Sequence, residues 1–168
     1  YGLTGIDSLA GPSEILIIAD ETAQSTHIAS DLLAQAEHDP LASSILLTTS
    51  KNQAKEVLEE VYKKIGDHPR KEICMQSIKN WGLIVICENY ESCVELSNNF
   101  APEHLEINVK NYKKYDKKIF NAGSICNGRY TPMSVSDYTV GTNHVLPTSG
   151  SSKFSSGLNI NEFIKKIS

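Results

Sequence analysis

The stretch "LLAQAEHDP" at 32–40 places an amide and an imidazole three residues apart, at Gln35 and His38, near the end of a predicted helix. Residues at this spacing share one flank of a helix, and Asp31 lies a turn earlier on the same flank. The partial negative charge at a helix C-terminus favours a cation there. An amide oxygen, an imidazole and a carboxylate together suit a zinc ion. The alternative is an ordinary surface helix end.

A second cluster, "APEHLEI" at 101–107, sets a carboxylate at Glu103 beside an imidazole at His104. Adjacent residues of a regular strand point to opposite faces of the sheet. Pro102 disfavours a helical entry, so a bend there would let both side chains reach one cavity. Such a pair suits general acid–base catalysis, because each environment can move a pKa toward neutrality. The alternative is an exposed start of a strand.

A third cluster, "SVSDYTVGTNHVLPT" at 134–148, carries Asp137 and His144 in a segment without periodicity. Gly141 permits a tight backbone path, so the segment could fold back and deliver both side chains to one point. Asp137 would suit a metal, and His144 would suit a ligand contact. The alternative is a loop braced by an Asx turn.

The elements that position these clusters alternate between strand and helix. Short β-branched or apolar runs predict strands at 14–20, 43–50, 82–87, 103–109 and 123–128. Helical spacing predicts helices at 22–38, 54–65, 70–80, 93–101 and 111–120. This order predicts an α/β fold, with an open, mainly parallel, Rossmann-like sheet of about five strands and flanking helices. Residues 1–128 form the predicted core, and 129–168 form a loop-rich extension of the same domain.

The lysine-rich stretch 111–120 is the least distinctive of these helices. Tyr112, Tyr115 and Ile119 are predicted to face inward, while four lysines face water. A phosphate or lipid patch would use the same lysines, but a solvated helix face is the simpler interpretation. The remaining histidines, His27 and His68, have no comparable neighbours and are predicted to lie on the surface.

The three clusters are expected to meet at one edge of the sheet. Helices of such a fold run antiparallel to the strands, so Gln35 and His38 would lie where strands begin. Glu103 and His104 start a strand, and Ser13 in "AGPSE" directly precedes the first one. This amino edge is opposite the carboxyl-edge crevice that holds a dinucleotide in Rossmann folds. No G-x-G-x-x-G follows the first strand, so a dinucleotide must bind by another route.

Composition narrows the classes of function and the compartment. The net charge of -4 argues against a nucleic-acid partner. No apolar run suits a membrane span and nothing resembles a signal peptide, so a cytoplasmic location is expected. Four cysteines without a C-x-x-C pair predict buried free thiols in a reducing cytosol. The start at Tyr1 and the helix-like end suggest a piece of a longer protein.

Taken together, six blocks make the chain resemble the central part of the histidinol dehydrogenase family over almost all 168 residues. The blocks occur in the family's order. They are "AGPSEILIIAD", "ASDLLAQAEHDP", "NNFAPEHLEI", "NAGSICNG", "DYTVGTNHVLPT" and "FSSGLNINEF".

This resemblance implies a zinc-dependent, NAD-linked enzyme of histidine biosynthesis that oxidises L-histidinol through L-histidinal to L-histidine. It implies that His104 is the general base for the substrate hydroxyl and that Glu103 activates water to hydrate the aldehyde. It also implies that the zinc orients the substrate through its amine and imidazole. The implied zinc ligands are Gln35, His38 and Asp137. The implied substrate contacts are Ser13, Gln35, His38, Glu103, His104, Asp137 and His144.

The family pattern extends beyond this chain. In the family, a partner subunit of a homodimer donates another zinc-binding histidine and a substrate-binding glutamate, and the main NAD contacts precede the residue that matches Tyr1. The isolated chain is therefore predicted to be inactive. "HDP" stands where His-Gly-Pro is usual, and "GSICNG" replaces a more apolar strand. Two other classes stay open: a non-enzymatic α/β module that binds a ligand or partner, and a metallohydrolase, which the absence of H-E-x-x-H disfavours.

Overall fold

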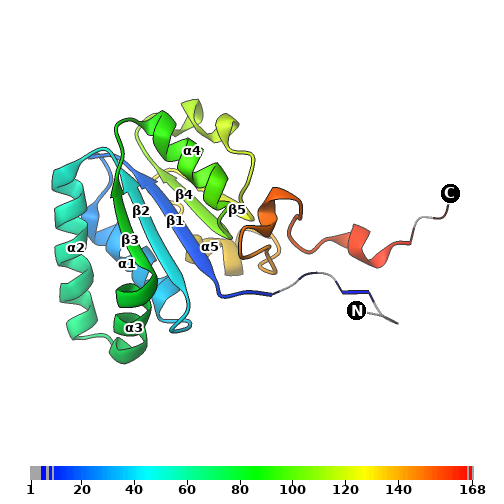
Figure 1. Ribbon diagram of the computed structural model, residues 1–168, viewed down its shortest axis with the longest axis horizontal. Helices are drawn as coiled ribbons and strands as arrows, with labels where there is room; N and C mark the ends of the chain where they lie inside the picture. The colour runs from blue at the N-terminus through cyan, green and yellow to red at the C-terminus, as the bar shows by residue number, and fades with distance from the viewer. Residues whose placement is uncertain (1–4, 7, 9, 166, 168) are drawn as a thin grey trace.

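The computed structural model describes residues 5, 6, 8, 10–165 and 167, apart from the side chain of Asp137. These residues form a parallel sheet of five strands in the order β3-β2-β1-β4-β5 (Figure 1). The strands are β1 (Glu14–Ala19), β2 (Ser43–Thr48), β3 (Gly82–Ile86), β4 (His104–Asn108) and β5 (Ser124–Asn127). The α-helices are α1 (Ser25–Ala36), α2 (Lys51–Gly66), α3 (Lys71–Trp81), α4 (Tyr90–Phe100) and α5 (Met133–Tyr138). The predicted α/β, Rossmann-like class is confirmed.

Both faces of the sheet are buried because alternate side chains of each strand enter different cores. Ile15 and Ile17 of β1 pack with α1, α2 and α3, whereas Leu16 and Ile18 pack with α4 and the segment after β4. The period of two residues in a strand produces this division. A parallel sheet covered on both faces favours continuous apolar runs such as that of β1, which made the strand recognisable.

The predicted helix over 111–120 is wrong. The structure has two short 3-10 helices there, at Tyr112–Lys114 and Asp116–Lys118. Tyr112 and Tyr115 lie three residues apart and pack on the α4 side of the sheet, and this spacing matches the 3-10 period. The exposed lysines do face water, and the ammonium of Lys114 lies 4.9 Å from the centre of the Tyr115 ring.

The segment 129–158, predicted to be a loop, contains the short helix α5. Pro132 precedes this helix, and the backbone N–H of its first residue, Met133, donates to the Glu106 carboxylate at 2.6 Å. Met133 itself is buried in the core with α1. The helix was not predictable because a contact with β4 stabilises it rather than a periodic pattern of its own. Further 3-10 turns lie at Ser151–Lys153 and Ile160–Phe163.

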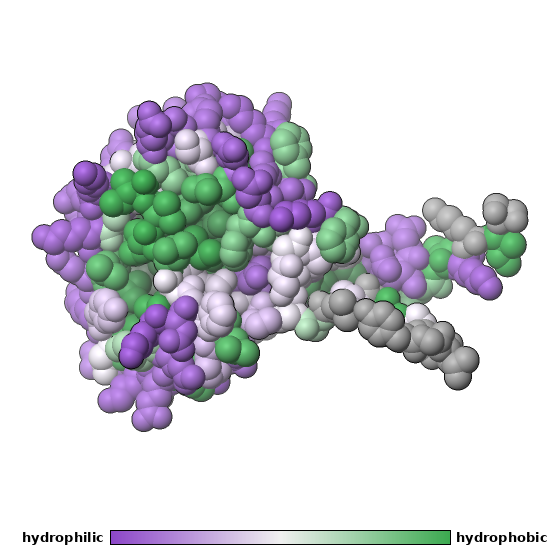
Figure 2. All heavy atoms as spheres, in the orientation of Figure 1, coloured by the Kyte–Doolittle hydropathy of each residue, from purple (hydrophilic) through white to green (hydrophobic). Residues whose placement is uncertain are grey.

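One edge of the sheet carries an apolar patch on the surface (Figure 2). Figure 2 shows apolar side chains gathered over β3 and β2, and Leu83 and Ile86 of the edge strand β3 are about half exposed. All four cysteines are buried, as predicted. Among the described helices, none is both long and apolar enough to cross a bilayer.

His27 is exposed, as predicted, but the surface prediction for His68 is wrong. Its side chain is half-buried, with Nε2 3.5 Å from the Glu37 carboxylate and Nδ1 3.5 Å from the Cys74 sulfur. The contact with Glu37 joins the end of α1 to the connection between α2 and α3. It was not predictable because the two residues are far apart in the sequence.

Candidate active site

The amino ends of β1, β2 and β4 meet at one edge of the sheet, where the polar clusters were expected. The carbonyl of Ser13 accepts the backbone N–H of Ser43 at 3.0 Å, and the N–H of Glu14 donates to the Glu103 carboxylate at 3.0 Å. Ile15 and His104 are partners in the parallel pairing of β1 with β4. The helix α1 also ends at this edge (Figure 1). The predicted placement at the amino edge is confirmed for these elements.

Glu103 and His104 contact each other although they are adjacent in the chain. The buried Ala101 adopts a left-handed conformation at φ 60°, which with Pro102 bends the chain before β4. Glu103 precedes the first residue of β4, so the alternation of side chains between the two faces of the sheet does not apply to it. Its Oε1 lies 3.7 Å from Nε2 of His104, and both side chains are about 95% buried. This separation is too long for a strong hydrogen bond but allows a charge contact when the imidazole is protonated.

A hydrogen bond across the sheet orients the His104 ring. Its Nδ1 lies 3.1 Å from the Ser124 hydroxyl of β5, the direct neighbour of His104 in the β4–β5 pairing. When Nδ1 donates to Ser124, Nε2 carries the lone pair that accepts a proton. This arrangement gives a buried imidazole with a fixed ring orientation.

Gln35 and His38 occupy different environments at the end of α1. Gln35 is only 1% exposed, and its Oε1 has no hydrogen-bond partner within the described part of the chain. His38 lies beyond the last helical residue, Ala36, and is exposed. The backbone N–H of His38 donates to the Gln35 carbonyl at 3.2 Å, so a tight turn keeps the two residues close. The predicted shared helical flank therefore applies to Asp31 and Gln35, but not to His38.

One face of β4 is polar along its whole length. Leu105 and Ile107 enter the core on the α4 side, so His104, Glu106 and Asn108 face α1 and α5. The Glu106 carboxyl lies close enough to the Asp31 carboxyl on α1 for each to affect the other's pKa, and Asn108 Nδ2 donates to Glu106 Oε2 at 3.1 Å. A buried column of polar groups therefore begins at the amino edge with His104.

The C-terminal extension reaches the same edge through the side chain of Thr148 and through Pro147. The N–H of Gly11 donates to the Thr148 hydroxyl at 2.7 Å. A Cβ at Gly123 would lie 3.2 Å from Pro147 and 2.6 Å from the Glu103 carbonyl, so only glycine permits this approach. His144, a few residues before, is exposed and Ser13 is half-buried. The side chain of Asp137 lies outside the described part of the structure, although its backbone belongs to α5.

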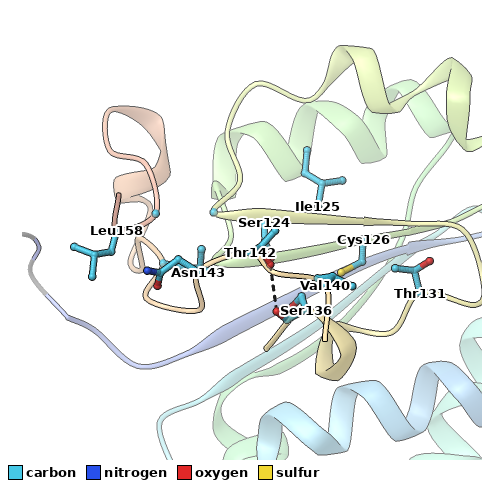
Figure 3. Close-up of a pocket in the computed structure, with 12 residues that line it drawn as sticks. Ser124, Ile125, Cys126, Thr131, Ser136, Val140, Thr142, Asn143 and Leu158 are labelled. Carbon is cyan, nitrogen blue, oxygen red and sulfur yellow. Dashed lines mark hydrogen bonds between the residues drawn. The ribbon is translucent and has the colours of Figure 1, made fainter. Parts of the chain in front are cut away.

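A cavity of about 450 Å³ lies between β5 and the extension (Figure 3). Ser124, the partner of His104, contributes to its wall, with Cys126 further along β5. Ser136 and Thr142 close the opposite wall, where the Thr142 hydroxyl donates to the Ser136 carbonyl at 3.2 Å. This mixed polar and apolar cavity adjoins the amino-edge residues through Ser124.

The carboxyl edge between β1 and β4, where the strand order reverses, has a carboxylate in place of a phosphate cradle. Asp20 follows β1, and its Oδ2 accepts the backbone N–H of Lys110 at 2.7 Å while Oδ1 accepts that of Thr22 at 3.0 Å. The N–H groups that bind phosphate in Rossmann folds are thus engaged by a negative side chain. This arrangement supports the expectation that a dinucleotide binds by another route.

The amino-edge residues fit a metal in one specific respect. Gln35 presents a buried amide oxygen without a partner among the described residues, which is the state expected of a ligand oxygen. In the described part of the chain no three Cys, His, Asp or Glu side chains converge as a metal site. Glutamine is not one of those four residue types, and the Asp137 side chain is not described. Of the three expected zinc ligands, this result therefore concerns His38 alone.

The carboxyl pair makes stability depend on pH. Burial raises the pKa of Asp31 to about 6, and burial together with the Asp31 charge raises that of Glu106 to about 8. The folded state therefore retains protons that the unfolded state releases near the ordinary pKa values of 3.8 and 4.5. Stability from these groups is fully present below those values and is lost as pH rises toward about 8.

We expect the free energy of unfolding of the full-length protein, relative to its Glu106→Gln variant, to fall between about pH 5 and about pH 8, by up to ~1.4 kcal/mol per pH unit. Urea titrations of both proteins across this range measure the difference. A difference independent of pH would show that Glu106 does not keep its proton in the folded state.

Two residues of the site were missed from the sequence. Ser124 is one of many serines, and nothing in "GSICNG" links it to His104, because the link depends on the pairing of β4 with β5. Glu106 did carry a signal. It lies two residues after His104, on the same face of a strand whose other face is apolar, and a buried ionisable side chain must have partners.

Comparisons with known proteins agree on one family. The sequence pattern of the histidinol dehydrogenase family matches residues 1–168. The histidinol dehydrogenase of Prochlorococcus marinus (strain MIT 9312) is 77% identical over the whole chain, which spans 38% of that relative's length. That of Methanocaldococcus jannaschii is 50% identical over 167 residues, 99% of this chain and 38% of the relative.

A solved structure leads to the same family. The crystal structure of histidinol dehydrogenase from Elizabethkingia anophelis matches with a TM-score of 0.91 at 43% identity, covering 96% of this chain and 37% of that one. With the family pattern matched from end to end, this likeness settles the family. The chain belongs to the histidinol dehydrogenase family.

Proposed function

We propose that the full-length protein is a zinc-dependent, NAD-linked dehydrogenase that oxidises L-histidinol through L-histidinal to L-histidine. This chain supplies the acid–base pair Glu103 and His104 and the zinc ligands Gln35, His38 and Asp137. The observation that carries the proposal is the buried contact between Glu103 and His104 at 3.7 Å, in a chain of this family. The two oxidations require removal of a proton from the substrate hydroxyl and of another from a water molecule. The contact places an imidazole and a carboxylate together that can serve as the two bases.

His104 serves the first oxidation. With Nδ1 held by the Ser124 hydroxyl at 3.1 Å, Nε2 accepts the proton of the substrate hydroxyl while the carbon-bound hydrogen leaves as hydride for NAD. The imidazolium that forms lies beside the Glu103 carboxylate, which stabilises its charge. Burial of both groups lowers the local dielectric and so strengthens this interaction.

Glu103 serves the second oxidation. Its Oε2 accepts the backbone N–H of Glu14, which fixes the carboxylate at the amino edge. There it removes a proton from the water that adds to the aldehyde, and the resulting hydrate loses a second hydride to a second NAD. One water, two hydrides transferred and three protons released balance the conversion of an alcohol to a carboxylate.

A zinc ion, when bound, would anchor the substrate and orient its reacting carbon. Gln35, His38 and Asp137 would hold it, together with a histidine of a partner subunit in a homodimer, and His144 and Ser13 would contact the substrate. Because residues beyond this chain complete such a site, the predicted inactivity of the isolated 168 residues stays a prediction. A cytoplasmic location is part of the same proposal.

Removal of the Gln35 amide tests the metal site. In the full-length enzyme, Gln35→Leu is expected to weaken zinc affinity by at least about 10-fold and to lower NADH formation from L-histidinol, because a ligand oxygen is lost. Chelator competition measures the affinity, and metal analysis gives the zinc content.

Gln53→Leu is the matched control. Gln53 is also buried but lies at the carboxyl edge, where its amide contacts the Asp20 carbonyl. This variant should bind zinc as the wild type does. Equal zinc affinity of the Gln35 variant and the wild type would reject Gln35 as a ligand. A metal-free wild type without NADH formation would favour the non-enzymatic binding module.

A further inference from the structure

The proposed mechanism leaves one buried ionisable cluster unused. Glu106 on β4 is fully buried, and its carboxyl lies close enough to the Asp31 carboxyl on α1 for each to affect the other's pKa. Its Oε1 accepts the backbone N–H of Met133 on α5 at 2.6 Å, and its Oε2 accepts Asn108 Nδ2 at 3.1 Å. Burial, together with the charge of the neighbouring carboxyl, makes it unfavourable to ionise both groups, which agrees with their raised pKa values.

This cluster joins three elements that carry site residues. β4 carries His104, α1 carries Gln35, and α5 carries residue 137. Few other buried polar contacts on this face connect them, because the neighbouring strand β1 presents Ile15 and Ile17 to the same core. Apolar contacts of that kind tolerate sliding, whereas the hydrogen bond from the Met133 N–H to Glu106 at 2.6 Å fixes α5 against β4.

The spacing of the residues converts this register into a position for Gln35. Four residues of α1, from Asp31 to Gln35, advance about 6 Å toward the amino edge. Two residues of β4, from Glu106 back to His104, advance about 6.6 Å in the same direction. The contact of Asp31 with Glu106 therefore sets the amide of Gln35 level with the imidazole of His104.

The same carboxyl sets the position of α5. Met133 is the first residue of this helix, so its N–H has no partner within the helix and is satisfied by Glu106. Residue 137 follows one turn later, about 6 Å along the helix axis. A six-residue helix is too short to be stable alone, so its position depends on such contacts.

We propose that Asp31 and Glu106 are positioning residues of the metal site, which hold α1 and α5 against β4 so that Gln35 and residue 137 keep their distances to His104. This inference rests on the proposed function. Buried charged or polar pairs contribute little net stability compared with well-packed apolar residues, so the expected effect of the pair is on geometry.

Two substitutions of Glu106 in the full-length enzyme separate positioning from simple burial. Glu106→Gln keeps an oxygen for the Met133 N–H and gains a donor for the Asp31 carboxylate. Glu106→Leu matches the side-chain volume approximately but removes every hydrogen bond. We expect zinc affinity, measured by chelator competition, to fall about 10–100-fold in the leucine variant. The glutamine variant should stay within about 3-fold of the wild type, because its oxygen still accepts the Met133 N–H that links α5 to β4, although the acceptor for Asn108 Nδ2 is lost.

Thermal unfolding and a matched control exclude a general loss of structure. Ser77→Ala removes a buried hydroxyl bond on α3, to the Ala42 carbonyl at 2.8 Å, and should leave zinc affinity unchanged. A folded leucine variant with wild-type zinc affinity would overturn the positioning role. If the leucine variant does not fold, Asp31→Ala replaces it, since Asp31 is only half-buried. Weaker zinc affinity then supports the proposal, and unchanged affinity overturns it.

The outcome is distinguishable from failure of the proposed function. If Gln35→Leu weakens zinc binding and Glu106→Leu does not, the metal site stands and the positioning role is rejected. If the wild-type enzyme binds no zinc, the proposed function and the positioning role are both rejected.

Discussion

Full-length enzyme carrying His104→Asn is expected to lose about 10²–10⁴-fold in kcat for the first oxidation of L-histidinol. Asparagine retains a polar group that can contact the Ser124 hydroxyl, so the β4–β5 pairing survives. It has no basic nitrogen, and the substrate hydroxyl then loses its proton to water. Stopped-flow measurement of the first NADH formed, at saturating substrate, reports this step.

The zinc content of the His104 variant is the control, because His104 is not a proposed ligand. Normal zinc content with a slow first hydride transfer would agree with a base. A kcat within about 3-fold of the wild type would reject that role, since general bases contribute at least about 100-fold.

Glu103→Gln is expected to act mainly on the second oxidation. Supplied L-histidinal should be oxidised about 10²–10⁴-fold more slowly, because an amide cannot remove a proton from the attacking water. The first hydride transfer should change less, through loss of the negative charge 3.7 Å from the His104 Nε2. The glutamine oxygen can still accept the Glu14 N–H, so the bend before β4 is retained.

Glu14→Gln is a matched control for that substitution. It removes a half-buried carboxylate next to Glu103 in the sheet, and burial raises the pKa of this group as well. Glu14 has no assigned role in the chemistry, so aldehyde oxidation should persist. Equal aldehyde oxidation by the wild type and the Glu103 variant would end the assignment of Glu103.

The sequence alone was sufficient for the elements with strong periodicity. The β-branched run at 15–18 and the apolar face from Ala54 to Ile65 each follow from side chains that must be buried on a strand or a helix. Alternation of such elements determined the α/β class and the parallel direction of the strands. The parallel direction of the strands was sufficient to predict that Gln35, Ser13 and Glu103 lie at the amino edge of the sheet. A crossover helix must end where the next strand begins.

Elements held by distant partners were not predictable. The helix α5 has no apolar period, and its first N–H is satisfied by Glu106, 27 residues earlier. The stretch 111–120 has tyrosines at a spacing that suits both an α-helix and a 3-10 turn, and packing against α4 decides between them. The local sequence pattern predicts which face of an element is apolar, but not which other element that face packs against.

The same distinction between local pattern and distant contacts applies to the candidate site. Residue types and spacing along the chain identified Glu103, His104, Gln35 and His38 as reactive or metal-binding groups. Only the folded chain shows that His104 contacts Ser124, that Gln35 is buried and His38 exposed, and that Asp31 meets Glu106. Each of these depends on strand order and register. Both arise from the packing of the whole sheet with its helices, so short stretches of sequence do not contain them.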